Sequence, residues 1–507
     1  MSRLRIAFLL LLAGSANLII AQTPAVLFNI KTFGAIGDGN TLVTRSINQA
    51  IDAANAAGGG TVYFPPGVYL SGSIHLKSNI TLFFEQGSRL LASGDPDVYD
   101  PVETDQKQWD KFQDFGHTYF HNSLIWGEQI HDVSIIGPGL IYGKGLTKQA
   151  DQRVGNKAIA LKLCRNIIIR DVSVLMGGHF AILATGVDNL TIDNVKIDTN
   201  RDGIDVDSCR HVRISNCSVN SPWDDAIVIK GSHALGFARA SEDLTITNCE
   251  VSGFENGTFL DGSYKRFGPP PERNGPTGRI KIGTESEGSF RNITISNCVF
   301  DYSRGLALET VDGAELEDVS ITNITMRDIA NAPIYVRLGQ RMRAPEGTPI
   351  GALRRVNISN VVVYNADPRY GSMILGTPGH NIDDLKLNHI RIYYAGGGSK
   401  EQAAIDPPEK ETEYPEPYRH GVMPAYGFFI RHARNIEMTD VEVSYLKEDV
   451  RPPFVLSDVD GAEFNLVKAQ HAAGVPTFKL VDVKNFSLFR CGALQDTRLG
   501  RVAQKEF

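Results

Sequence analysis

The sequence predicts an all-β protein that forms a single-stranded parallel β-helix, a solenoid whose chain winds repeatedly around one hydrophobic core. The main observation is a repeat of short units, in which apolar and polar residues alternate on both sides of a small polar corner, usually asparagine. The corners Asp171, Asn194 and Asn216 are spaced 23 and 22 residues apart. Units this short leave no room for a helix between strands, and the blades of a β-propeller need about 40 residues or more. The repeat therefore favours a β-helix over a βαβ fold or a propeller.

A second observation is an amphipathic helix expected between Thr44 and Ala57, with Thr44 as its N-cap and Gly58–Gly60 ending it. Its apolar residues recur at helical spacing, at Ile47, Ala50, Ile51 and Ala54. A short helix here would cap the N-terminal end of the solenoid, because the first coil otherwise exposes its core and a strand edge.

Four strands are expected before the repeats begin. They are Val26–Phe33, Thr61–Phe64, Ser73–Leu76 and Ile80–Phe84. The repeating units then start at Asn166, Asn189, His211, Leu244, Ile293, Val319, Val356, Leu385 and Ile436. Asparagine at their corners tolerates the left-handed backbone conformation, and stacked side-chain amides can hydrogen-bond along the solenoid axis.

The chain is expected to form one parallel β-helix domain, residues 22–491, followed by a loose C-terminal tail at 492–507. Loop insertions interrupt the repeats at 95–129, 254–277 and 400–419. Long loops on a rigid scaffold usually shape binding sites. We therefore expect the insertions to border the functional groove.

Met1–Ala21 has the pattern of a secretory signal peptide, with Arg3 and Arg5 before an apolar run. The run is too short and too close to the N-terminus to favour a membrane span. Its removal takes away two positive charges, so the net charge falls from −7 to −9. That charge argues against binding nucleic acid through net charge alone. We expect an exported protein, periplasmic or extracellular; its oligomeric state is not indicated.

Six cysteines could form disulfides in an exported chain. However, Cys217, Cys249 and Cys298 each follow an asparagine in the same local frame. An equal frame means an equal place in successive coils, so a buried stack of small apolar thiols is the better interpretation.

The strongest functional signal is a group of acids at Asp202, Asp224 and Asp225. Asp202-Gly-Ile and Asp225-Ala-Ile are 23 residues apart, so one coil would stack the two acids roughly 4.8 Å apart. The pleat sends Asp224 to the other side of Asp225. Three gathered carboxylates are costly unless proton or water chemistry uses them. A solvated acidic edge or a cation site is the alternative.

Several stretches resemble glycoside hydrolase family 28, the polygalacturonase and rhamnogalacturonan hydrolase family. They are the N-terminal stretch Phe28–Leu82, GPGLIYGKG from Gly137, N-x-D-G-I-D at Asn200–Asp205 and DDAIVIK at Asp224–Lys230. The resemblance implies a right-handed parallel β-helix that hydrolyses α-linked pectic poly- or oligosaccharide with inversion, without metal or cofactor. It further implies that Asp224 is the general acid, and that Asp202 and Asp225 share the attacking water as the base.

The sequence departs from the family pattern at two places. Gly278 occupies the position of the family's G-H-G histidine, and Ala307-Leu308-Glu309 replaces the R-I-K that binds the uronate. Arg279 and Lys281, or Arg337 from a later coil, could supply a substitute carboxylate clamp. Further expected substrate-binding residues are His179, Trp223 and Glu285.

Three function classes stay open. The leading one is an inverting, polygalacturonase-like hydrolase, with exo attack favoured if the insertions close the groove. A pectate-lyase-type enzyme would instead eliminate across the bond, with calcium held by Asp202, Asp205, Asp224 and Asp225. A non-catalytic glycan-binding solenoid is the third.

Overall fold

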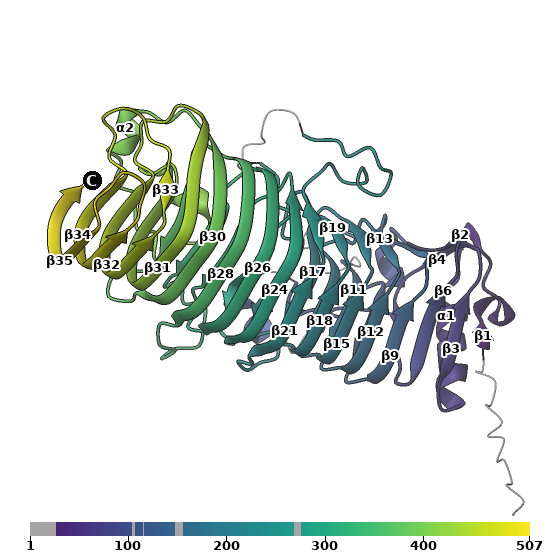
Figure 1. The fold of residues 1–507 in the computed structure, drawn as a ribbon. Coiled ribbons are helices and arrows are strands. Elements are labelled where there is room, and N and C mark those ends of the chain that lie inside the picture. Colours follow the sequence, from purple (N-terminus) through teal and green to yellow (C-terminus); the bar gives the residue numbers. More distant parts are fainter. Residues whose placement is uncertain (1–26, 104–106, 115, 148–155, 268–274) are drawn as a thin grey trace, which may run out of the picture.

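The computed structural model describes residues 27–103, 107–114, 116–147, 156–267 and 275–507, and it confirms the right-handed parallel β-helix. The coils follow one another along a single axis, from α1 (Thr44–Ala56) at one end to β35 (Thr497–Glu506) at the other (Figure 1). The expected signal peptide lies outside the described residues. Within those residues, none of the helices has the length and apolar character needed to cross a membrane.

Each early coil contributes one strand to each of three parallel stacks. Stack 1 contains β5 (Ile74–His75), β8 (Ile125–Glu128), β11 (Lys157–Lys162), β14 (Phe180–Thr185), β17 (Asp202–Asp207), β20 (Ile227–Gly231), β23 (Ile280–Ser286), β25 (Leu306–Thr310), β27 (Ile334–Leu338) and β29 (Ser372–Leu375). Stack 2 contains β1 (Leu27–Asn29), β3 (Gly60–Phe64), β6 (Ile80–Phe84), β9 (His131–Ile136), β12 (Arg165–Arg170), β15 (Asp188–Asp193), β18 (Arg210–Ser215) and β21 (Ser241–Thr247). Stack 3 contains β2 (Asp38–Leu42), β4 (Gly67–Ser71), β7 (Ser88–Ala92), β10 (Leu140–Tyr142), β13 (Ser173–Leu175), β16 (Lys196–Asp198), β19 (Ser218–Asn220) and β22 (Glu250–Ser252).

Later coils use longer strands, several of which run through more than one stack. These are β24 (Phe290–Asp301), β26 (Glu315–Ile329), β28 (Ala352–Ala366), β30 (Ile382–Gly396), β31 (Phe428–Lys447), β32 (Phe454–Asn465), β33 (Lys468–Ala469) and β34 (Phe478–Phe489). The remaining helices are α2 (Lys400–Ala403) and short 3₁₀ turns at Ile30–Phe33, Pro96–Val98, Lys107–Phe112 and Pro417–His420.

The core consists of apolar residues stacked in register from coil to coil. In stack 1, Ile182 pairs with Ile204, Ile204 with Ile227, and Ile227 with Ile280. All four side chains have no exposed surface. Burying a side chain of this size stabilises a fold by about 1.5–3 kcal/mol. A shifted register would expose these isoleucines, so their stacking fixes the register of the coils that carry them.

The corners behave as the repeat predicts. Asn194, Asn216 and Asn297 have φ values of 52°, 57° and 55°, in the left-handed region. Their amides form ladders along the axis: Asn323 donates to Asn297 at 2.9 Å and accepts from Asn360 at 3.2 Å. The predicted thiol stack is also present: Cys217, Cys249 and Cys298 are free and buried, and the pairing of the residues that follow them places them in register on successive coils.

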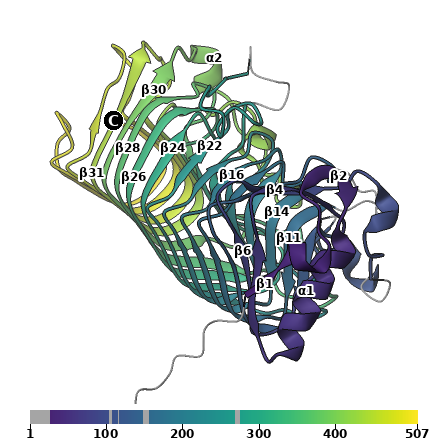
Figure 2. The same cartoon turned by 90° about the vertical axis from the view of Figure 1, so that its right-hand side faces the viewer.

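Three local expectations need correction. The expected first strand Val26–Phe33 becomes β1 and then a 3₁₀ turn, because the Asn29 side chain accepts a hydrogen bond from the Lys31 N–H and bends the chain. Thr44 is the first helical residue rather than the N-cap, and its hydroxyl oxygen accepts from the Gly72 N–H instead. Helix α1 covers the first coil as expected (Figure 2).

The third correction concerns residues 492–507, which were expected to be a loose tail. They contain β35, which pairs antiparallel with β34 along its length. An antiparallel strand is a way to cover the open edge of the last coil, which a solenoid must protect.

The corner conformation can be tested at Asn323, which has a φ of 57°. Asn323→Ala should cost about 1–2 kcal/mol for the left-handed backbone beyond the lost hydrogen bonds, whereas Asn323→Gly should lose only the hydrogen bonds. Thermal unfolding should therefore show the glycine variant to be the more stable one. At Thr325, on the adjacent strand segment, the order should reverse, because glycine weakens an ordinary strand. An alanine variant of Asn323 as stable as the glycine variant would contradict this account.

Candidate active site

The two acidic motifs lie on neighbouring coils of stack 1. Ile204 of β17 pairs with Ile227 of β20, and the Gly203 N–H donates to the Asp225 carbonyl at 3.0 Å. Asp202 therefore lies one coil from Asp225, as the 23-residue spacing predicts. One carboxylate oxygen from each of Asp202, Asp224 and Asp225 lies within 4.8 Å of the others.

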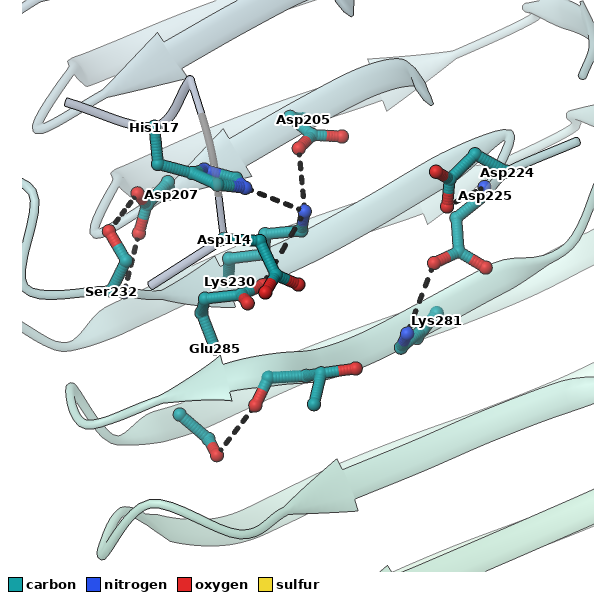
Figure 3. Close-up of polar contacts among 12 residues, drawn as sticks. Asp114, His117, Asp205, Asp207, Asp224, Asp225, Lys230, Ser232, Lys281 and Glu285 are labelled. Atoms are coloured by element: carbon teal, nitrogen blue, oxygen red, sulfur yellow. Dashed lines mark hydrogen bonds and ion pairs between the residues drawn. The ribbon is translucent and has the colours of Figure 1, made fainter. Parts of the chain in front are cut away.

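Asp225 is buried and held by two cations. One carboxylate oxygen accepts from Arg279 Nε at 2.8 Å, and the other lies 3.2 Å from Lys281 Nζ (Figure 3). Burial by itself would raise the pKa of Asp225, but the charges of Lys281 and Arg279 outweigh it and hold the pKa below its usual value. Asp225 is therefore a carboxylate across the working pH range of most enzymes.

Asp202 has the opposite electrostatic environment. Burial, followed by the nearby charges of Asp205 and Asp224, raises the pKa of Asp202 well above its usual value. Asp205 is itself paired with a cation: the Lys230 ammonium lies 3.0 Å from Asp205 and 3.1 Å from His117 Nε2 (Figure 3). Burial raises the pKa of Asp205 to about 7, although Lys230 acts in the other direction. At mildly acidic pH, Asp225 is thus the ionised member of the stacked pair.

Asp224 differs from the two stacked acids because its side chain is only partly buried, at 26% exposed. One oxygen is 2.8 Å from Arg201 Nη2, and the other accepts the backbone N–H of Asp225 at 3.1 Å. These two contacts fix the carboxyl group at the surface of a pocket.

The pocket has a volume of about 240 Å³ and lies over the acidic cluster. All three inserted segments contribute to its wall, together with the turn that carries Asp224. The lining residues are Asp114, Arg201, Trp223, Asp224, Gly275, Thr277, Lys281, Arg304, Tyr414, Glu416 and Tyr418. We call this cavity the catalytic pocket. It holds three cations, Arg201, Lys281 and Arg304, together with three acids.

The face of stack 1 is covered on the N-terminal side of the catalytic pocket. Phe120, from the first insertion, is buried against Ala160 of β11 and against Phe180 and Leu183 of β14. The neighbouring His117 ring packs on Phe180 with a centroid distance of 4.9 Å. This segment occupies the surface on which an extended chain would otherwise lie.

The face is also covered on the C-terminal side. Met423 and Ala425 are buried against Tyr335 of β27 and Met373 of β29, and Tyr418 packs on the same cluster. His420 Nε2 lies 3.3 Å from the Tyr335 hydroxyl. The end of the third insertion and the residues that follow it therefore cover stack 1 beyond the catalytic pocket, and the acids lie beside a pocket rather than in an open groove.

The structure corrects the expected uronate clamp. Arg337 is 2% exposed and donates to the carbonyls of Gly376 and Glu409, at 2.8 and 3.0 Å, so it does not reach the pocket. Arg279 is also buried, and binds Asp225 and Glu416. Of the three expected cations, only Lys281 lines the pocket.

Glu285 was expected to bind sugar hydroxyls, but the structure corrects this as well. Its carboxylate is 1% exposed, and it lies 2.9 Å from Arg343 Nη2 and 3.6 Å from Lys230 Nζ. Because cations surround it, Glu285 instead balances the charge of Lys230 beneath the acids.

His179 and Trp223 both lie near the acids, as expected, but in different environments. His179 is 7% exposed, with Nε2 3.4 Å from Arg201 Nη2, and it is not part of the pocket lining. Trp223 is 38% exposed and lines the pocket. Its ring is thus placed to stack on a sugar, whereas His179 contacts the site through Arg201.

Both departures from the family pattern have a packing reason. Gly278 has a φ of 46°, and an added Cβ would lie 2.1 Å from the Ser252 carbonyl oxygen, so no histidine fits there. Glu309 is buried, 3.5 Å from Lys281 Nζ and 3.9 Å from Arg279 Nη2. In place of the family's R-I-K cations, this coil carries the acid Glu309, which pairs with Lys281 and Arg279 of the preceding coil.

Sequence reasoning missed most of the pocket wall. Arg201 stands inside the N-x-D-G-I-D motif and could have been noticed there. Asp114, Arg304, Tyr414, Glu416 and Tyr418 carry no local signal, because the first and the last three belong to insertions and Arg304 to a turn between strands.

Comparisons with known proteins agree with this geometry. Residues 102–258 match the model of glycosyl hydrolases family 28, and residues 27–88 match the rhamnogalacturonase A/epimerase, pectate lyase-like model. A "Probable polygalacturonase" of Vitis vinifera is 27% identical over 382 residues, covering 67% of this chain and 74% of that protein. An exo-poly-α-D-galacturonosidase of Dickeya chrysanthemi is 31% identical over 188 residues, 35% of this chain and 30% of that protein.

Among solved structures, the exopolygalacturonase of Thermotoga maritima superposes with a TM-score of 0.55. The alignment covers 96% of each chain at 19% identity. At that identity the likeness shows the fold, and it extends over nearly the whole solenoid.

A Lys281 variant can distinguish two roles of this residue: holding the pKa of Asp225 down, or contacting the substrate directly. If Lys281 holds the pKa of Asp225 down, Lys281→Met should raise that pKa and move the acidic limb of the kcat/KM profile upward by about 1–2 pH units. Activity should recover at higher pH, and Lys281→Arg should shift the limb less. The exposed Lys386→Met is the matched control. A loss of the same size at every pH would contradict the pKa role.

Proposed function

We propose that this family 28 glycoside hydrolase removes terminal galacturonic acid units from α-linked pectic chains, with inversion at the anomeric carbon. The observation that carries the proposal is the catalytic pocket, whose wall places Asp224 of the acidic cluster together with three cations. The sequence relatives, a polygalacturonase and an exo-poly-α-D-galacturonosidase, act on substrates of this class by their names.

Exo attack is supported by the covers on stack 1. An endo-acting enzyme needs a groove that is open at both ends, so that a long chain can lie across the acids. Here Phe120 packs on β14, directly beside β17, and the cluster around Met423 lies on β25, β27 and β29, with β23 between it and β20. A pocket of this shape accepts a chain end.

A uronate substrate is supported by the charges of the pocket wall. Arg201, Lys281 and Arg304 all line the pocket around Asp224. Arginine binds carboxylates through paired N–H donors, and each charge-assisted contact contributes about 1.5–3 kcal/mol. Each cation already pairs with an acid of the site, Arg201 with Asp224, Lys281 with Asp225 and Arg304 with Glu416. A uronate carboxylate would join these ion pairs, and the local positive charge supports galacturonic acid as the bound unit.

The proposed mechanism assigns one proton transfer to each side of the bond. The partly exposed Asp224 donates its proton to the glycosidic oxygen as the bond to the anomeric carbon breaks. A water held between Asp202 and Asp225 attacks that carbon, and its proton passes to the Asp225 carboxylate. Two oxygens within 4.8 Å of each other can both hydrogen-bond one water at about 2.8 Å.

The separation of the acid and the base is compatible with a single displacement. Inverting pairs are typically 6.5–9.5 Å apart, and retaining pairs about 5–5.5 Å. The 4.8 Å limit joins the nearest oxygens of the cluster. Each carboxyl carbon lies about 1.2 Å beyond its oxygen, so the carbons are at most about 7.2 Å apart. This upper limit includes the start of the inverting range as well as the retaining range, and the stereochemistry of the product decides between them.

Calcium-assisted elimination fits the donor set less well. A metal at the cluster would need the oxygens of Asp225, but Arg279 and Lys281 already bind both of them. Asp205 is likewise paired with Lys230. A non-catalytic role is disfavoured because a glycan-binding surface has no need for buried acids with pKa values shifted in opposite directions.

We also propose that the protein acts outside the cytoplasm. The support is the signal-like pattern of residues 1–21 together with a polymeric plant cell-wall substrate, which is met outside the cell.

The products test exo attack directly. The wild-type enzyme should release monogalacturonate from polygalacturonate, with reducing ends rising much faster than viscosity falls. Asp224→Asn should lower the rate by about 10²–10⁴ with an unchanged melting temperature. Early oligomers of mixed length would contradict the closed pocket, and normal turnover by Asp224→Asn would contradict the assigned acid.

The stereochemistry tests the water held by Asp202 and Asp225. A single displacement converts an α-linked substrate to a β-anomer, whereas a covalent intermediate retains the α configuration. Proton NMR of the first-formed product should show the β-anomer before mutarotation. Initial appearance of the α-anomer would rule out direct attack by that water.

A further inference from the structure

A second pocket lies beside the catalytic pocket, and Gly275 lines both. It has a volume of about 350 Å³, and its wall includes Arg266, Phe267, Tyr302, Asp328, Asn365 and Arg369. We propose that this adjoining pocket binds the sugar units of the pectic chain that lie beyond the cleaved bond. The inference rests on the proposed function and adds a binding site for the remainder of the substrate.

The two pockets share an aromatic wall. Trp223 lines the catalytic pocket and Phe267 lines the adjoining pocket, and their ring centroids are 5.0 Å apart with an interplanar angle of 54°. Trp223 directly precedes Asp224 in sequence. A chain whose terminal unit reaches Asp224 therefore meets Trp223 and then Phe267 as it leaves the pocket.

The segments that cover stack 1 favour this path for the polysaccharide, from the catalytic pocket past Trp223 and Phe267. Phe120 occupies the strand face on one side of the acids, and Tyr418 and Met423 occupy it on the other. In the described part of the chain, stack 1 is therefore covered at β14 on one side and from β25 onward on the other. The remainder of the substrate can turn across the strands before this second cover, towards the second insertion and the adjoining pocket.

The chemistry of the adjoining pocket suits a uronate-containing chain. Arg266 lies over the Tyr302 ring at 4.7 Å and is paired with Asp328 at 2.8 Å. Arg369 stands in the same wall, paired with Asp367 at 2.6 Å. The two arginine side chains are 45% and 38% exposed, so a sugar carboxylate can approach these ion pairs from the pocket.

Aromatic and polar groups also lie where a sugar ring needs both. Phe267 and Tyr302 offer apolar surface, and the Asn365 amide is held by a hydrogen bond to Asp328 at 2.7 Å. Ligand pockets generally combine apolar walls with a few oriented polar groups. The adjoining pocket has this composition.

The test compares galacturonate oligomers of two to five units. For the wild-type enzyme, kcat/KM should rise with chain length as the added units enter the adjoining pocket. In Phe267→Ala and in Arg369→Gln, the ratio of kcat/KM for the tetramer to that for the dimer should fall about tenfold, equivalent to 1.4 kcal/mol. Arg391→Gln, which removes an exposed arginine outside both pockets, should leave the ratio unchanged. An unchanged ratio in both pocket variants would overturn the proposal.

A binding measurement separates failure of this inference from failure of the proposed function. If the wild-type enzyme cleaves none of the galacturonates, the proposed function is wrong. Calorimetry with tetragalacturonate then tests the adjoining pocket alone. Weaker binding by Phe267→Ala than by the wild-type protein would support the pocket, whereas equal binding, or no binding to the wild-type protein, would overturn it.

Discussion

The register between successive coils of stack 1 is the constraint on which the site depends. Rows of buried isoleucines fix that register, and left-handed asparagine corners set the length of each coil. A slip of one residue would turn core side chains outward and separate the acids. The proximity of Asp202 and Asp225 is therefore a consequence of packing beneath them, since neither carboxylate stabilises the other.

Buried charge is the second determinant, and it is balanced locally. Arg279 and Lys281 keep Asp225 ionised, while Lys230 lies among Asp205, Glu285 and His117. Desolvating a charge is expensive unless a partner lies in contact. The two stacked acids thus differ in protonation although their backbone positions are equivalent, because one faces cations and the other faces acids.

The insertions convert a generic solenoid face into a pocket. Phe120 covers β14 beside the acids, the segment around Met423 covers stack 1 from β25 onward, and the second insertion brings Phe267 against Trp223. The regular coils supply the rigid floor and the reacting groups. The loops decide which end of which chain can reach them, so the scaffold and the specificity are encoded in different parts of the sequence.

The sequence by itself determined the β-helix, the left-handed corners, the thiol stack and the stacking of Asp202 on Asp225. These features arise from a period of 22–26 residues and from side chains that repeat within it. Only the tertiary structure decided that β35 (Thr497–Glu506) pairs with β34, that Arg337 is buried away from the site, and that Arg304, Tyr414 and Glu416 line the pocket. The Arg279–Glu416 contact joins residues 137 apart. No local pattern encodes such a contact, because an irregular loop takes its path from the surface it packs on.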